Sequence, residues 1–266
     1  MRRGLLMALW SGRTGAIVGA MSLDVDRALE RVLSEGDEWR SWRALKLAGD
    51  DPGALPDIPG QDGTGGFAGP SGRLSPGTTA LELCHLKLIG VADEPAAVVA
   101  ADWIEAARTP AEAWLDAPDD VPGVIDDHGA GRVWATAAAS CALLATSRTP
   151  GPRALDLLRS EADQEGHFTG GAYPTFASAG AYWLAEGPRS EIAEWALRWA
   201  REWSEDWWGP YEHSSALILW MAAGVPVEHP SVDGFLDELR SDAPQQEGWG
   251  DLEVTLRALE LLRFSE

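Results

Sequence analysis

Three short clusters along the chain carry the side chains best suited to acid–base chemistry. A carboxyl group that its neighbours keep protonated can donate a proton, and a carboxylate beside an imidazole can help to accept one. The candidate catalytic residues are the acids and one imidazole of these clusters, namely Asp126 and Asp127 beside His128, Glu212 with His213, and Asp251 with Glu253.

Each cluster also has a purely structural interpretation. Asp126 and Asp127 could hold a metal ion, but loop acids in a chain this acidic are commonly just solvated. Glu212, Asp251 and Glu253 lie where apolar helices are expected to begin, and the helix dipole favours acidic residues there. His213 could be an ordinary, partly buried residue. The residues alone leave both interpretations open.

Aromatic residues gather in or near the turns that precede the apolar helices. The chain has 14 tryptophans, and most of them are explained by packing between helices. Those in the turns could instead line a pocket and stabilise a cation through their π faces. The candidate substrate-binding residues are Trp134, Tyr173, Phe176, Trp208, Tyr211 and Trp249.

The cysteines and histidines do not predict a metal site. A zinc ion needs three or four converging ligands, whereas Cys84 and His85 are adjacent on an expected helix and point about 100° apart. Cys84 and Cys141 lie in apolar helical runs, where a free thiol behaves as a small hydrophobic group. We therefore expect no metal and no cofactor, and free thiols in a reducing, cytoplasmic environment.

Helical periodicity dominates the chain, and no run of alternating β-branched and polar residues is evident, so the sequence predicts an all-α fold. Helices that are apolar on most sides alternate with amphipathic ones, which indicates inner helices covered by outer ones. The inner helices centre near Leu45, Leu83, Ala139, Ala179, Leu217 and Leu256, at intervals of 38, 56, 40, 38 and 39 residues. About six helical hairpins follow, as an open solenoid or a closed ring.

A glycine turn recurs ahead of the inner helices. Residues 246–251 read Gln-Glu-Gly-Trp-Gly-Asp, and weaker copies begin at Gln164 and Gln61. Inner helices also start with Thr-Ala-like pairs, as at Thr79 and Thr136. These motifs resemble the repeat shared by squalene-hopene-type terpene cyclases and protein prenyltransferase β subunits, over roughly residues 37 to 266.

This resemblance implies an α/α toroid with a prenyl substrate in a central cavity and the glycine turns at its mouth. It also implies a structural role for Gln246 and Trp249, which would tie neighbouring repeats together. The catalytic signatures of both families are missing, because no inner helix is preceded by Asp-x-Asp-Asp and no Asp, Cys and His set for zinc is present. Whether the protein is an enzyme is therefore left open, and no α subunit is implied.

Charge and the N-terminal segment limit the partners. The net charge of −21 disfavours binding to nucleic acid and to anionic membranes. The apolar run after Arg3 is broken at Ser11 and is too short for a membrane span. We expect residues 1–20 to be a poorly ordered start-site extension and residues 21–266 to form a single toroid domain; protein partners and oligomeric state stay open.

Three functions remain possible at this point. The first is a terpene cyclase-like or prenyltransferase-like protein that acts on or binds an isoprenoid, by acid-initiated cyclisation if it is an enzyme. The second is a non-catalytic lipid-binding or scaffold toroid. The third is a carbohydrate-active toroid enzyme with carboxyls such as Asp126 and Asp251 across the cavity. An aromatic, dry cavity favours the first, a filled one the second, and a polar one the third.

Overall fold

The computed structural model describes residues 25–123, 129–204, 208–242 and 249–265. The regular secondary-structure elements within these ranges are all helices, joined by loops. The inner helices are α2 (Glu38–Leu47), α3 (Pro76–Leu88), α5 (Ala130–Ala145), α7 (Ala172–Glu186), α9 (Pro210–Ala222) and α11 (Leu252–Phe264). The outer helices are α1 (Val25–Glu35), α4 (Pro95–Ala106), α6 (Pro152–Glu161), α8 (Glu191–Glu202) and α10 (Pro230–Ser241).

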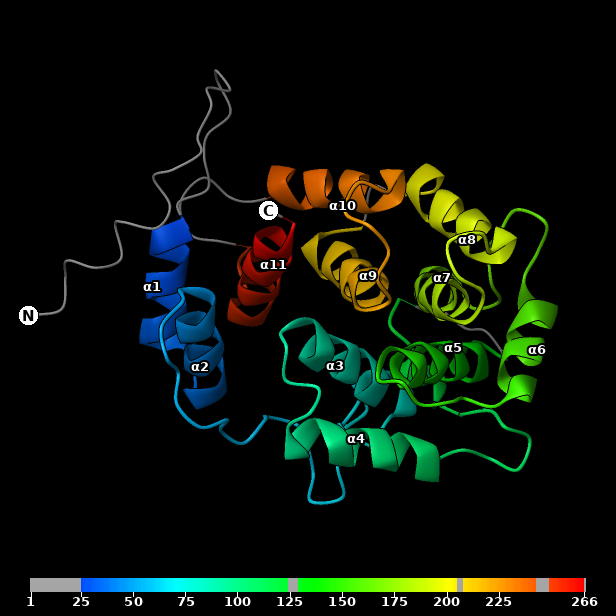
Figure 1. Cartoon of the computed structure of the whole chain (residues 1–266), viewed down its shortest axis with the longest axis horizontal. Coiled ribbons are helices and arrows are strands. Elements are labelled where there is room, and N and C mark those ends of the chain that lie inside the picture. The colour runs from blue at the N-terminus through cyan, green and yellow to red at the C-terminus, as the bar shows by residue number, and fades with distance from the viewer. Residues whose placement is uncertain (1–24, 124–128, 205–207, 243–248, 266) are drawn as a thin grey trace, which may run out of the picture.

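The helices form an α/α toroid, which confirms the predicted fold class. Figure 1 shows the outer helices around the inner ones. Helix α11 packs against α2, so the last inner helix meets the first. Helix α9 also packs against α3 and α5, and the buried side chains of these helices belong to one hydrophobic core.

Small residues allow the inner helices to approach one another closely. Nearly every residue of α5 is buried, and half of the buried residues are alanines, which occupy little space between α3 and α7. At Gly180 of α7, an added Cβ would come within 2.8 Å of Cys141 Sγ and 3.1 Å of the Leu219 carbonyl oxygen. Only glycine fits this crossing, because protein interiors are close-packed.

One hydrogen bond recurs at the starts of four inner helices. In each case a backbone N–H of an aromatic residue in the preceding loop donates to a threonine hydroxyl in the first turns of the helix. The pairs are Phe67 with Thr79 (2.9 Å), Trp114 with Thr136 (3.1 Å), Phe168 with Thr175 (3.0 Å) and Trp249 with Thr255 (3.0 Å). Four of the repeats therefore share the same hydrogen bond between the loop and the inner helix that follows it.

Two of these aromatic side chains also link the turn to an outer helix. The indole N–H of Trp114 donates to the Ile104 carbonyl at 2.6 Å, and that of Trp249 donates to the Leu239 carbonyl at 2.9 Å. Trp249 thus ties the start of α11 to the end of α10, as the resemblance implies, whereas Gln246 lies outside the described residues. None of the described helices is long and apolar enough to cross a membrane.

Candidate functional site

The N-terminal ends of α5, α7 and α9 bring most of the candidate aromatic residues together. The rings of Trp134 and Tyr173 meet edge to face, with their centroids 5.8 Å apart. Tyr173 also lies 6.5 Å from Tyr211 and 5.7 Å from Phe176, and Phe176 lies 5.2 Å from Trp208. We call these five residues the mouth cluster. Trp249 lies apart, against the end of α10.

The mouth cluster is packed rather than open. Trp134 and Phe176 are fully buried and Tyr173 is 1% exposed, while Tyr211 is 44% exposed. Solvent therefore meets the cluster chiefly at Tyr211. The assignment of these residues to substrate binding stays a prediction.

Asp116 adds an acidic group beside this cluster. Its Oδ2 accepts the N–H of Gly77, in the first turn of α3, at 2.9 Å. A Cβ at Gly77 would clash with both Asp116 Oδ2 and Trp134 Nε1, so the carboxyl and the indole crowd the same residue. Asp116 Oδ1 and Trp134 Nε1 are buried and find no hydrogen-bond partner among the described residues.

The surroundings of Asp116 suit it to proton transfer. Burial raises the pKa of its carboxyl to about 7, although hydrogen bonds from Ser75 and Gly77 oppose the rise. A carboxyl whose pKa lies near neutrality populates both protonation states there, as general acid–base catalysis requires. Sequence reasoning missed Asp116 because nothing in its proline-rich loop signals which helix end the side chain will reach.

Glu212 and His213 are not brought together. Glu212 Oε2 accepts the N–H of Gly209 at 2.9 Å and so caps α9, and its Oε1 accepts the hydroxyl of Tyr173 at 3.3 Å. His213 faces the other way, with its ring 5.1 Å from that of Phe235 on α10. Neither nitrogen of His213 forms a hydrogen bond with a described residue. Burial and the Glu212 carboxylate raise the pKa of Tyr173.

Asp251 and Glu253 also form different contacts and do not act as a pair. Asp251 is the N-cap of α11, where its carboxylate accepts the N–H groups of Glu253 and Val254 at 2.7 and 3.2 Å. Glu253 points inward and pairs with Arg43 at 2.6 Å. Burial alone would raise the pKa of Glu253, but the charges on Arg43 and Arg257 hold it far below its usual range. Glu253 stays ionised and does not suit the role of proton donor.

Asp126 and Asp127 lie outside the described residues. Their candidate catalytic role, and the suggested pairing of Asp126 with Asp251 across a cavity, stay predictions. No group of three or more His, Cys, Asp or Glu residues in the described ranges could hold a metal ion. Cys84 and Cys141 are free and buried.

A largely buried column of charged residues lies between α2, α3 and α11. Arg43 donates to both oxygens of Glu260, at 2.9 and 2.7 Å, and His85 Nε2 lies 2.8 Å from the same carboxylate. Arg257 pairs with Glu253 at 2.9 Å and with Glu82. We call these six residues the charged column.

The charges in this column compensate one another. Burial alone would raise the pKa values of Glu82 and Glu260, but the guanidinium groups of Arg257 and Arg43 hold each at about 2. The sequence does hold a signal for this column, because Glu82 and His85, and likewise Arg257 and Glu260, are three residues apart on apolar helices. The partner of each charge, however, lies on another helix.

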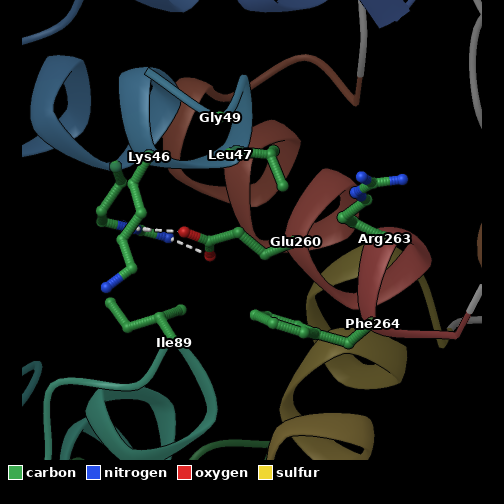
Figure 2. Close-up of a pocket in the computed structure, with 8 residues that line it drawn as sticks. Lys46, Leu47, Gly49, Ile89, Glu260, Arg263 and Phe264 are labelled. Atoms are coloured by element: carbon green, nitrogen blue, oxygen red, sulfur yellow. Dashed lines mark hydrogen bonds and ion pairs between the residues drawn. The ribbon is translucent and has the colours of Figure 1, made fainter. Parts of the chain in front are cut away.

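The charged column ends at a cavity of about 240 Å³ between the C-terminal ends of α2, α3 and α11. Figure 2 shows Glu260 and Phe264 extending from α11 toward Lys46 and Ile89. The residues that line it are Arg43, Lys46, Leu47, Gly49, Ile89, Glu260, Arg263 and Phe264. It lies at the opposite end of the inner helices from the mouth cluster.

No protein-family model and no curated protein matches the chain. Among solved structures, the chain is similar to the apo form of the type II terpene cyclase MstE from Scytonema. The two share 13% sequence identity with a TM-score of 0.48, over 91% of this chain and 87% of that chain. This similarity concerns the arrangement of the helices alone.

Proposed function

We propose that the protein binds an isoprenoid or a similar apolar molecule at the mouth cluster, and that Asp116 is the proton-transfer group of this site. The observation that carries the proposal is the position of Asp116, whose buried Oδ1 has no described partner and whose Oδ2 crowds the same residue, Gly77, as the fully buried indole of Trp134. An unpartnered buried polar atom is costly, and a bound ligand would offset that cost.

The chemistry of this site would start from the neutral acid. Asp116 donates its proton to the ligand, and the carboxylate that remains is stabilised by the Gly77 N–H and by the N-terminal dipole of α3. The positive charge that forms on the ligand meets the aromatic faces of the mouth cluster. A proton lost from the product cation to Asp116 restores the acid.

The pKa of Asp116 narrows the class of reaction. A carboxylic acid with a pKa of about 7 is a weak acid. It suits protonation of an oxygen, as in an epoxide or an alcohol, better than protonation of a simple alkene. An apolar ligand with such an oxygen is therefore the favoured substrate class.

A second candidate function is a non-catalytic toroid that binds a lipid or serves as a scaffold. The close packing of α3, α5, α7 and α9 favours it, because their apolar side chains occupy the space that a long substrate would need. In this case Asp116 would bind an oxygen of the ligand without turning it over.

The test is incubation of the purified protein with polyprenyl alcohols, polyprenyl diphosphates, squalene and an epoxide of squalene, followed by mass spectrometry. We expect wild type to convert an oxygenated ligand, and Asp116→Asn to retain the ligand without converting it. Asp119→Asn is the matched control, because Asp119 is an exposed acid in the same loop. Retention without conversion in wild type supports the non-catalytic function, and neither retention nor conversion removes both.

A further inference from the structure

We propose that the buried carboxylate of Asp120 keeps the proton on Asp116, and that Asp120 is thereby a positioning residue of the proton-transfer site. This inference rests on the function proposed above, because it names the group that holds Asp116 ready to donate. It is carried by the fixed place of a second buried acid beside the same helix start.

Asp120 is a buried acid whose carboxylate is held in one orientation. It ends the short 3-10 helix η2 (Pro118–Asp120) and is 2% exposed. Its Oδ1 accepts the N–H of Ser71 at 2.8 Å, and its Oδ2 accepts the Ser71 hydroxyl at 2.9 Å. The cation of Arg73 is 3.8 Å away on a side chain that is 63% exposed. Because a cation so exposed compensates only part of a buried charge, Asp120 remains a source of negative potential inside the protein.

Asp120 lies beside the residues that bind Asp116. A Cβ at Gly69 would come within 2.5 Å of Asp120 Oδ1 and 3.0 Å of the Ser75 Cβ, so these two side chains flank the same glycine. Ser75 is the N-cap of α3 and forms a hydrogen bond with Asp116, which also accepts the N–H of Gly77 at 2.9 Å. The carboxyl groups of Asp116 and Asp120 therefore both lie near the N-terminus of α3.

The surroundings of the two acids differ in the direction that a proton donor needs. Asp120 receives two hydrogen bonds from Ser71, which stabilise a carboxylate, whereas Asp116 Oδ1 receives none from the described residues. Burial is the main reason that the pKa of Asp116 rises to about 7, and the negative charge of Asp120 adds to the rise. Two acids in unlike surroundings can thus divide the roles of proton donor and fixed charge.

The elements around Asp116 supply few other charges. The first turns of α3 and α5 contain no acidic residue. Arg132, in the first turn of α5, pairs with Glu161 at 2.6 Å. Asp119, in the loop that carries Asp116, is exposed. Asp120 is therefore the buried charge of the described residues that acts on Asp116.

Carboxyl carbon NMR of the full-length protein tests the inference without a ligand. Asp120→Asn removes the charge and keeps the size of the side chain, so it should lower the titration midpoint of Asp116 by about half a pH unit or more. Asp119→Asn is the matched control, because it removes the same charge from an exposed neighbour and should leave the midpoint unchanged. Ser71→Ala removes one donor to Asp120 but leaves its charge, so the midpoint should again stay near that of wild type.

An exposed variant tests the sign of the effect even if Asp120→Asn does not fold. Arg73→Met removes the counter-charge of Asp120 and should raise the midpoint of Asp116, and a fall or no change would count against the inference. An unchanged midpoint in Asp120→Asn, or an equal fall in Asp119→Asn or Ser71→Ala, would overturn it.

The pH dependence of turnover separates this inference from the proposed function. If wild type converts an oxygenated ligand, activity should be lost on the basic side at a lower pH in Asp120→Asn than in wild type, in step with the midpoint of Asp116. Turnover with an unshifted pH profile would contradict the role of Asp120 and leave the proposed function standing. A lowered midpoint without turnover in wild type would contradict the proposed function and leave the coupling of the two acids standing.

Discussion

Arg43 of α2 and Glu260 of α11 form two hydrogen bonds, of 2.9 and 2.7 Å, in the interior of the ring. The two residues are 217 positions apart, and their side chains are 1% and 4% exposed. This pair joins the first inner helix, α2, to the last, α11. Buried polar contacts replace apolar packing on this side of the ring.

Removal of Arg43 should destabilise the protein strongly. Arg43→Met leaves Glu260 buried with its main counter-charge missing, and breaking a buried pair in this way costs about 3–5 kcal/mol. The free energy of unfolding in urea measures the loss. Arg40→Met is the control, because Arg40 is part-exposed and its pairs with Asp37 and Glu253 are worth about 0–1 kcal/mol each. Equal losses in the two variants would contradict the assigned role of the pair.

Acid should weaken the fold through the charged column. The pKa values of Glu82 and Glu260 fall from 4.5 to about 2 on folding. A lowered folded-state pKa gives stability that is present above the unfolded value and is lost as the pH falls through the folded value. We therefore expect the free energy of unfolding to decrease as the pH falls from about 4.5 toward 2. A Glu260→Gln variant should show a shallower decrease, and an unchanged slope would refute this origin.

Asp116 should make the free energy of unfolding depend on pH in the opposite direction to Glu82 and Glu260. Its pKa rises from 3.8 to about 7 on folding, so the native state holds a proton that the unfolded state releases. Stability from this group is fully present below about 3.8 and is lost as the pH rises toward 7. Asp116→Asn should therefore gain stability over wild type at pH values above about 7. Carboxyl carbon NMR should place the titration midpoint near neutrality, and a midpoint near 3.8 would contradict the proposed environment.

The recurring threonines should each contribute to stability. Thr79→Val and Thr255→Val remove the hydroxyls that accept the N–H groups of Phe67 and Trp249, and a buried donor without a partner costs about 1–3 kcal/mol. Thermal unfolding measures the loss. Thr78→Val is the neighbouring control on α3, where the half-buried side chain should tolerate the change. A loss in the control as large as in Thr79→Val would show that helix propensity, not the hydrogen bond, is responsible.

The inner and outer helices could be predicted because the spacing of apolar residues along a helix indicates which of its faces are buried. All six predicted centres, from Leu45 to Leu256, fall within the six inner helices. The packing of α11 against α2 could not be predicted, because no local pattern encodes contacts between helices so far apart in the chain.

The chemistry of the sites was less predictable than the helices. Five of the six candidate aromatic residues meet at one place, since helix starts that follow similar turns converge in a toroid. Glu253 was nominated as an acid because it stands near a helix start, yet it faces inward to Arg43 from 210 residues away. The position of Asp116 depends on the path of a long loop, for which the sequence offers no periodicity.

Photoaffinity labelling tests the central proposal most directly. A polyprenyl alcohol with a diazirine on its terminal isoprene unit would be irradiated with the full-length protein, with and without an excess of the unlabelled alcohol, and the labelled peptides would be sequenced. We predict labelling at the starts of α5, α7 and α9, around Trp134, Tyr173 and Tyr211, that the unlabelled alcohol suppresses. Labelling that is not suppressed, or that is confined to Ile89 and Phe264 at the opposite end of the ring, would contradict an isoprenoid site at the mouth cluster.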